Sequence, residues 1–273
     1  FEDLDSIEIK TPLGKYMNSR FNACVKESRA ALDSYRFNDA CTAIYRFLWT
    51  EFCDWGIELS KRSPDSIPEL GAVFKDSLKL LHPMMPFFTE YIYQTLSGAR
   101  LEESKSIMIK KFPTLKDRDL EAEEQFDVLM DIIVTIRRLK ALLDMPASEI
   151  EHIKVRLYKN IDKELIERFV PRLTRCKNVE IVEGRVSNSV PDIGGHCEAY
   201  ISSEGLLIEP IKERLKLQKT KTDKEIQKLR GVLNNKNFTQ NAPKEVIEQQ
   251  EEELRDAELR IRRIDMQLEI IDG

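Results

Sequence analysis

The chain has 273 residues, of which 33% are charged and 8% aromatic, and its formal net charge is −5. This length allows more than one domain, whereas the content of only 10 glycines argues against a glycine-rich nucleotide-binding fold. No apolar run approaches the roughly 18 residues that a membrane span needs. The sequence starts with Phe1 rather than Met, so we expect a piece of a longer cytoplasmic protein that does not bind membranes.

The cysteine pattern excludes two kinds of site. None of the five cysteines belongs to a Cys-x-x-Cys pair and their number is odd, so neither a disulfide framework nor a zinc knuckle is predicted. His196 and Cys197 could supply half of a metal site, but no second pair lies at a useful spacing. We therefore expect no metal.

Residues 1–147 carry apolar side chains at helical spacing. Pro12 suits a first helical turn, and Asn38 is a plausible N-cap for the next helix. The inward face of that second helix is predicted to include Trp49, Phe52 and Trp55. The predicted helices cover residues 11–35, 38–59, 67–82, 88–96 and 119–145. Five helices with short links predict a bundle.

Two further local expectations concern this bundle. Residues 106–109 read as a short extended piece between the fourth and fifth helices. Pro146 is expected to end the fifth helix, because proline cannot continue a helical hydrogen-bond ladder.

The apolar period changes to two in the next region, residues 148–205. Strands are predicted at 151–157, 179–182 and 198–201, with a short helix at 161–173 and a loop at 191–195. We interpret this region as a small α/β domain.

Residues 206–273 return to helical spacing in two arms. Apolar residues of the second arm, from Leu254 to Ile271, follow alternating steps of three and four, which is the pattern of a coiled coil. An Asn-rich stretch, residues 234–241, predicts a hairpin turn between them. The first arm carries nine basic and three acidic residues between Lys212 and Lys236, whereas the second carries ten acidic and five basic residues. This asymmetry favours antiparallel pairing and leaves bases free to meet phosphates.

Several motifs resemble one family. Residues 32–40 (LDSYRFNDA), 44–49 (IYRFLW), 51–55 (EFCDW) and 78–87 (LKLLHPMMPF) are similar to the helical region of class I valyl-tRNA synthetases and their leucyl and isoleucyl relatives. Residues 233–238 (LNNKNF) and 242–247 (APKEVI) resemble the hairpin tip of the valyl arm, and the cysteine-bearing zinc region of isoleucyl enzymes is absent.

This resemblance implies a mainly α protein with a helical anticodon-binding domain, a small α/β domain and an antiparallel two-helix coiled coil. It implies that the chain binds tRNA, preferably valine-accepting tRNA, as a monomer. The family's HIGH and KMSKS motifs are missing, so the chain is expected to carry no catalytic residue and no cofactor. The full-length enzyme would use ATP to attach valine to tRNA. Alternatives are the equivalent region of an isoleucyl or leucyl enzyme, or a structural coiled-coil module that binds a protein.

The candidate tRNA contacts combine basic, polar and aromatic side chains at helix ends and on the arm. RNA recognition needs stacking and phosphate contacts. Phe238 could stack on RNA or pack between the arms. Arg20 is expected on the outer face of the first helix. The candidates are Arg20, Arg36, Phe37, Asn38, Arg137, Arg138, Lys140, Lys216, Lys219, Lys224, Lys228 and Phe238.

Overall fold

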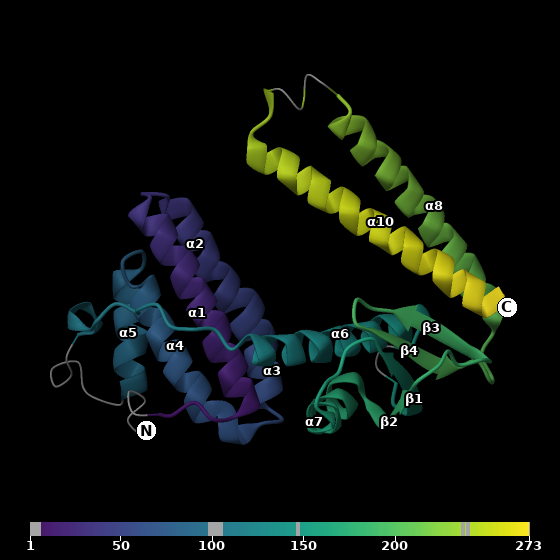
Figure 1. Ribbon diagram of the computed structural model, residues 1–273, viewed down its shortest axis with the longest axis horizontal. Helices are drawn as coiled ribbons and strands as arrows, with labels where there is room; N and C mark the ends of the chain where they lie inside the picture. The colour runs from purple at the N-terminus through teal and green to yellow at the C-terminus, as the bar shows by residue number, and fades with distance from the viewer. Residues whose placement is uncertain (1–6, 98–105, 146–147, 236–237, 239–240, 273) are drawn as a thin grey trace. The chain divides into compact units, whose positions relative to one another are not determined.

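The protein is mainly helical, as predicted, with one four-stranded sheet (Figure 1). The computed structural model describes residues 7–97, 106–145, 148–235, 238 and 241–272. The chain forms two compact units, Phe1–Asp127 and Val128–Gly273, whose boundary lies within helix α6 (Leu120–Leu142). No described helix is both long and apolar enough to span a lipid bilayer.

The first unit is a bundle in which α1 packs against α2, η1 and α4, and α4 packs against α5. Helix α1 begins as the sequence predicts, because the Thr11 hydroxyl accepts a hydrogen bond from the Gly14 amide at 3.0 Å. The rings of Tyr16 and Phe126 stack with centroids 4.6 Å apart and join α6 to the core. The elements are α1 (Pro12–Asp33), α2 (Phe37–Arg46), η1 (Phe47–Gly56), α3 (Ile57–Ser60), η2 (Pro64–Ser66), α4 (Ile67–Leu81), α5 (Pro86–Ser97) and η3 (Ile107–Ile109).

A π-helix in the second predicted helix was not foreseen. Elements α2, η1 and α3 run on without a break, but η1 has i→i+5 geometry. The buried positions consequently step by five residues from Phe47 to Phe52. This step turns Trp49 outward, so its predicted place in the core is wrong, whereas Phe52 is buried and Trp55 half-buried as expected.

Three local expectations in and beside this unit fail for capping reasons. Helix α2 begins at Phe37, so Asn38 is not its N-cap. Residues 107–109 form a 3-10 turn rather than an extended piece, because the Ser106 hydroxyl accepts a hydrogen bond from the Met108 amide. Helix α6 ends at Leu142, before residue 145, because Asp144 adopts a left-handed backbone conformation. Pro146, expected to end it, lies outside the described residues.

The second unit contains a mixed sheet of order β2-β1-β4-β3. Strand β1 runs parallel to β2, with α7 as the crossover, and antiparallel to β4, which pairs antiparallel with β3. The Asp162 carboxylate caps α7 by accepting from the Glu164 amide at 2.9 Å. The elements are β1 (Ile150–Leu157), α7 (Lys163–Thr174), β2 (Cys176–Val182), β3 (Ser189–Ile193) and β4 (Cys197–Ser202).

Strand β3 occupies most of the segment that was predicted to be a loop. Its five residues are all buried, so they show no alternation of polar and apolar exposure. Pro191 is tolerated because β3 lies at the edge of the sheet, where a missing amide donor costs least. Proline and glycine are therefore poor indicators of a loop at this point.

Gly194 is required where the chain leaves β3, because α6 approaches closely. A Cβ atom there would lie 2.4 Å from Asp131 Oδ2 and 2.5 Å from Thr135 Oγ1. The Asp131 carboxylate is held in place by the His196 amide, which donates to it at 2.7 Å. We predict that Gly194→Ala lowers the free energy of unfolding by about 1–3 kcal/mol, measured by urea denaturation.

The adjacent glycine supplies a matched control for this prediction. A Cβ at Gly195 meets no atom within 4 Å, and its φ is not in the left-handed region. Gly195→Ala should therefore leave stability unchanged or raise it by about 0.4–1 kcal/mol through the unfolded state. Equal effects of the two substitutions would contradict the packing explanation.

Helices α8 (Ile208–Leu233) and α10 (Lys244–Asp272) form the predicted hairpin and pack along their length. Their buried seam includes Leu215, Ile226 and Ala257. Ion pairs join Lys219 to Asp265 at 2.6 Å, Glu225 to Arg260 at 2.7 Å and Arg230 to Glu258 at 2.6 Å. Residue numbers rise on one helix as they fall on the other, so the helices are antiparallel.

Candidate nucleic-acid interface

The turn between α1 and α2 displays two aromatic rings to solvent. Tyr35 is 82% exposed and Phe37 59% exposed, and their rings meet edge to face with centroids 6.4 Å apart. Tyr35 has φ +58°, a left-handed conformation in which glycine is usual at a helix end. The Arg36 amide closes the turn by donating to the Ala31 carbonyl at 2.8 Å. A bulky residue in a strained position, with its ring in water, points to a role outside folding.

Arg36 lies between these two aromatic residues in the chain, and Asn38 follows Phe37. The Arg36 guanidinium lies 2.9 Å from the Asp39 carboxylate, and both side chains are largely exposed. Asn38 is exposed as well. Cation, amide and aromatic groups thus share one turn of chain, the combination that unstacked RNA bases require.

A second exposed aromatic pair was not expected from the sequence. Tyr45 and Trp49 stack nearly parallel, with centroids 6.1 Å apart and an interplanar angle of 7°. They are 63% and 59% exposed. The pair depends on the π-helix that turns Trp49 outward, and a regular 3.6-residue period could not reveal it.

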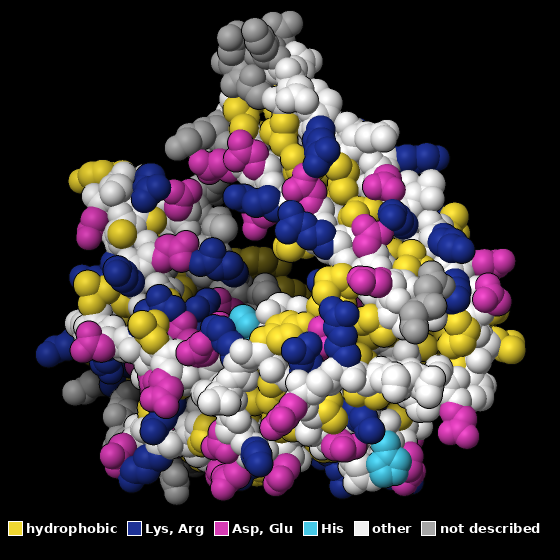
Figure 2. All heavy atoms as spheres, turned by 45° about the vertical axis from the view of Figure 1, so that its right-hand side comes forward, with side chains coloured by type: hydrophobic (Ala, Val, Ile, Leu, Met, Phe, Trp, Pro, Cys, Tyr) yellow, Lys and Arg dark blue, Asp and Glu magenta, His cyan; other side chains and the backbone are white. Residues whose placement is uncertain are grey.

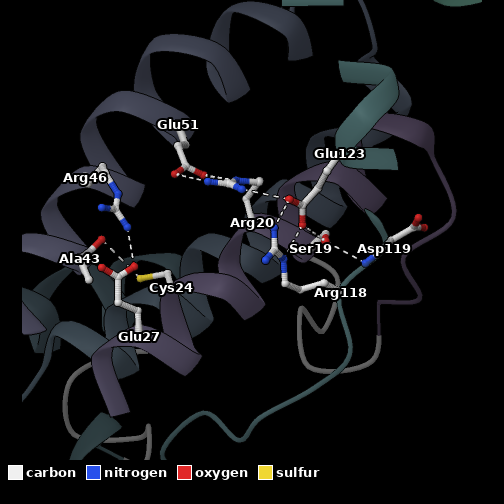
Figure 3. Close-up of polar contacts among 10 residues, drawn as sticks. All are labelled: Ser19, Arg20, Cys24, Glu27, Ala43, Arg46, Glu51, Arg118, Asp119 and Glu123. Atoms are coloured by element: carbon white, nitrogen blue, oxygen red, sulfur yellow. Dashed lines mark hydrogen bonds and ion pairs between the residues drawn. The ribbon is translucent and has the colours of Figure 1, made fainter. Parts of the chain in front are cut away.

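Arg20 is not on an outer face, contrary to expectation, but within an ion-pair network of the bundle (Figure 3). Its guanidinium donates to both oxygens of Glu51 at 2.7 and 2.9 Å and to Glu123 at 2.9 Å. These contacts raise the pKa of Arg20, with the hydrogen bond to Glu51 as the largest cause. Its N–H donors hold η1 and α6 against α1, so few donors of Arg20 remain to contact RNA.

Glu123 is the centre of that network. It is 5% exposed and accepts hydrogen bonds from Ser19, Arg20 and Arg118. Burial alone would raise its pKa, but the hydrogen bonds from Arg118, Ser19 and Arg20 outweigh burial and lower the pKa to about 2. The carboxylate is therefore ionised at neutral pH.

The three bases near the end of α6 do not form the expected cluster. Arg137 is exposed and donates twice to the Leu173 carbonyl, at 3.1 and 3.0 Å. Arg138 lies 2.8 Å from the buried Asp192 carboxylate on β3. Lys140 is 1% exposed, and its ammonium donates to two backbone carbonyls at 2.6 Å. Burial lowers the pKa of Lys140. Lys140 cannot reach RNA from this position, so its expected contact is wrong.

The α8 lysines fall into two sets. Lys219 is engaged with Asp265 and helps to hold the helices together. Lys216, Lys224 and Lys228 are exposed, and none forms an ion pair with another residue that the structure describes. At 3.6 residues per turn these three lie on the side of α8 away from its buried seam. We call them the outer lysines.

Acidic side chains are interspersed with Lys and Arg over the hairpin, at the top of Figure 2. The face of the hairpin seen in Figure 2 is therefore not uniformly positive. Phe238 near the tip is half-buried, which leaves its two expected roles open. Its neighbours at 236–237 and 239–240 lie outside the described residues.

No metal site arises from the described residues, in which no three ligand-type side chains cluster. Burial raises the pKa of the Cys197 thiol. The thiol lies 3.7 Å from Asp131, in the core beside α6.

Comparison with known families accounts for most of the chain. Residues 14–156 match the model of the anticodon-binding domain of tRNA ligases, and residues 208–272 match that of the valyl-tRNA synthetase tRNA-binding arm. The match of the hairpin favours the valyl family over its leucyl and isoleucyl relatives.

Curated valine–tRNA ligases align along the whole chain. That of Wolinella succinogenes is 47% identical over 273 residues, covering 100% of this chain and 30% of the relative. That of Nitratiruptor is 48% identical over 268 residues, with 98% and 30% covered. The Thermotoga maritima protein is 34% identical over 275 residues, with 97% and 31% covered. The chain spans about three tenths of the length of these relatives. It belongs to the valyl-tRNA synthetase family, as the region with the anticodon-binding domain and the tRNA-binding arm.

Proposed function

We propose that this chain holds valine-accepting tRNA at two places, its anticodon loop and its elbow. The observation that carries this proposal is the division of the α8 lysines. Lys219 stabilises the hairpin, whereas the outer lysines add nothing to it that the described residues show. Positive charge that does not serve the fold is suited to the phosphates of an RNA backbone.

The anticodon loop is assigned to the α1–α2 turn. Loop bases can be splayed out and stacked on aromatic rings, which Tyr35 and Phe37 present with their faces exposed. Arg36 would contact a neighbouring phosphate and Asn38 a base edge. The pair Tyr45 and Trp49 offers a further stacking surface on the same continuous helix.

The elbow is assigned to the outer lysines. Their spacing along α8, from Lys216 to Lys228, covers about 18 Å at 1.5 Å per residue. Because successive phosphates of one duplex strand rise by about 3.4 Å along the helix axis, that length spans several of them. Lysine suits such contacts because its ammonium is a point charge that makes no demand on sequence.

The wider activity follows from the relatives named valine–tRNA ligase. We propose that the protein that carries this chain attaches valine to tRNA with ATP, in the cytoplasm and as a monomer. Within it, residues 1–147, 148–205 and 206–273 would act as anticodon-binding domain, connecting α/β domain and arm. The present chain would supply affinity and discrimination.

We predict that Tyr35→Ala combined with Phe37→Ala weakens binding of valine-accepting tRNA by about 10- to 100-fold, because stacking contributes roughly 1–3 kcal/mol per base. Both rings are exposed, so thermal stability should change little. Fluorescence anisotropy of labelled tRNA at two salt concentrations measures the effect.

A matched control removes two exposed apolar side chains from another part of the bundle. Phe87 is 90% exposed and Tyr91 is 66% exposed, both on α5. Phe87→Ala combined with Tyr91→Ala should leave tRNA affinity within about twofold, since the proposal assigns neither ring to a base of the tRNA. Equal losses in the two double variants would contradict the assignment of the anticodon loop.

A protein-binding coiled-coil module is the competing function, and Leu217, 58% exposed on α8, is the observation that favours it. The two functions differ in their ligands. If the chain binds no tRNA at low salt, the tRNA proposal fails and the module remains.

A further inference from the structure

A cavity of about 530 Å³ lies where the hairpin meets α6 and β3 within the second unit. The Gln267 amide anchors this end of α10 by donating to the Pro191 carbonyl at 3.0 Å and to Asp192 at 3.1 Å. The lining is strongly basic, with five cations against two carboxylates. The charged lining residues are Arg138, Arg214, Lys221, Arg260, Arg263, Asp192 and Glu225.

Three of the five cations are already neutralised. Arg138 pairs with Asp192 at 2.8 Å, and Arg260 pairs with Glu225 at 2.7 Å. Arg214 pairs with Asp144, which is outside the lining, and donates to the Leu142 carbonyl at 2.7 Å. Both lining carboxylates are therefore in use, which leaves Arg263 and Lys221.

Arg263 is the unusual member of this set. Its side chain is half-buried, yet it forms no ion pair or hydrogen bond with the residues that the structure describes. Burial and the charge of Arg138 lower the pKa of its guanidinium, and the carboxylates of Asp192 and Asp131 offset these effects only in part. Burying a cation beside a like charge costs free energy. The contacts of Arg263 with the described residues offset that cost only in part.

The chemistry of the lining indicates which class of ligand would bind Arg263 in this cavity. A guanidinium fork matches carboxylate and phosphate oxygens alike. Two unneutralised cations, with three further cations close by, suit an anion of charge −2 or more, which favours phosphate over a single carboxylate. The volume exceeds that of one phosphate group and admits a pyrophosphate or a stretch of phosphodiester.

We propose that this cavity is a phosphate-binding site at the base of the hairpin, with Arg263 as the principal ligand and Lys221 at its rim. Bound phosphate would touch α8 and α10 together and lie close to Arg138 of α6. It would tie the hairpin to the body of this unit. The site is separate from the outer lysines, which lie on the side of α8 away from α10, and it can bind free phosphate whether or not the hairpin binds tRNA.

The test uses the 273-residue chain, inorganic pyrophosphate as the probe, and potassium chloride at matched ionic strength as the reference. We expect pyrophosphate to protect Arg263 from phenylglyoxal, read by peptide mass spectrometry, and to raise Tm. In Arg263→Gln the Tm increase at a fixed pyrophosphate concentration should shrink, and pyrophosphate affinity by calorimetry should fall by about tenfold or more, as expected when a charge-assisted hydrogen bond is removed.

The neighbouring Arg262 is the matched control, because it is exposed on the same helix and does not line the cavity. Arg262→Gln removes the same charge and should change pyrophosphate affinity by less than about twofold, as expected for an exposed charge. Without pyrophosphate, Arg263→Met should be at least as stable as the wild type, since it removes an uncompensated buried charge. Destabilisation by Arg263→Met would mean that Arg263 serves the fold, and it would overturn the proposal.

Two outcomes of this experiment distinguish the source of the phosphate. If tRNA also protects Arg263, and Arg263→Gln weakens tRNA binding more than Arg262→Gln does, the natural occupant is an RNA phosphate. If pyrophosphate protects Arg263 and tRNA does not, the occupant is a small anion. Absence of protection by either, or equal affinity losses in the two glutamine variants, overturns the site.

Discussion

Reversing the three outer lysines, as Lys216→Glu, Lys224→Glu and Lys228→Glu together, should weaken tRNA binding by at least about 100-fold at low salt. Each reversal takes away a cation that neutralises a phosphate and adds a repulsive carboxylate. The slope of log affinity against log salt concentration should also become shallower, by about 0.9 for each duplex phosphate that the variant no longer neutralises. Anisotropy titrations at several salt concentrations measure both quantities.

A charge-matched control separates direct phosphate binding from the effect of net charge. Lys163, Arg168 and Arg172 are exposed bases on α7, a helix of the second unit that is not part of the hairpin. Reversing these three changes the net charge equally, and we expect affinity losses below about fivefold, because exposed charges beyond a Debye length are screened. Similar losses in both triple variants would mean that tRNA responds only to overall charge.

Replacing Glu123 by Gln should lower the free energy of unfolding of the bundle by about 3–5 kcal/mol, the usual cost of breaking a buried ion pair from one side. The substitution keeps the shape of the side chain but leaves Arg118 without its counter-charge. It also removes one of the two carboxylates that accept hydrogen bonds from Arg20. The cost arises because a buried Gln offers one carbonyl acceptor in place of two carboxylate oxygens, so donors of Ser19, Arg20 and Arg118 lose their partner. Chemical denaturation followed by circular dichroism measures the loss.

The pH dependence of stability should also show the contribution of the ionised Glu123 carboxylate. The pKa of Glu123 in the folded chain is about 2, against roughly 4.3 in an unfolded chain. Its contribution is fully present above the unfolded value and is lost as the pH falls through about 2. The wild type should therefore lose more stability than Glu123→Gln between about pH 4.5 and pH 2.

Glu121 provides the control on the same helix. It is exposed, lies two residues before Glu123, and forms none of the hydrogen bonds that centre on Glu123. Glu121→Gln should cost less than about 1 kcal/mol, the usual value of an acid at a helix N-terminus. A loss as large as that of Glu123→Gln would show that the network contributes little.

Periodicity predicted most helices because each buries one face. Apolar spacing located α1, α4, α5 and α7, and Pro12 marked the start of α1 correctly. The hairpin followed from a repeat of three and four residues. These patterns are local, so they can be read without knowing what the chain packs against.

Features that depend on tertiary packing escaped prediction. The π-helix of η1 changes the face on which Trp49 lies, and a regular 3.6-residue period does not reveal it. Strand β3 is buried on both sides and therefore lacks the alternation that identifies a strand.

The exposure of the candidate residues was predicted best where the side chains take no part in the packing of the core. Arg36, Phe37 and the outer lysines are exposed, as expected. Arg20 and Lys140 point into the protein instead. Two carboxylates accept the hydrogen bonds of Arg20, and two backbone carbonyls accept those of Lys140. A basic residue looks the same in sequence whether its partner is a phosphate or a carboxylate distant along the chain.

Hydroxyl-radical footprinting of valine-accepting tRNA bound to the chain tests the central claim most directly. We expect two separate protected regions, one in the anticodon loop and one at the elbow. The Tyr35 and Phe37 double variant should lose the first region, and the triple lysine variant should lose the second. A tRNA left unprotected in both regions, or protected only in its acceptor stem, would contradict the assignment of these two surfaces.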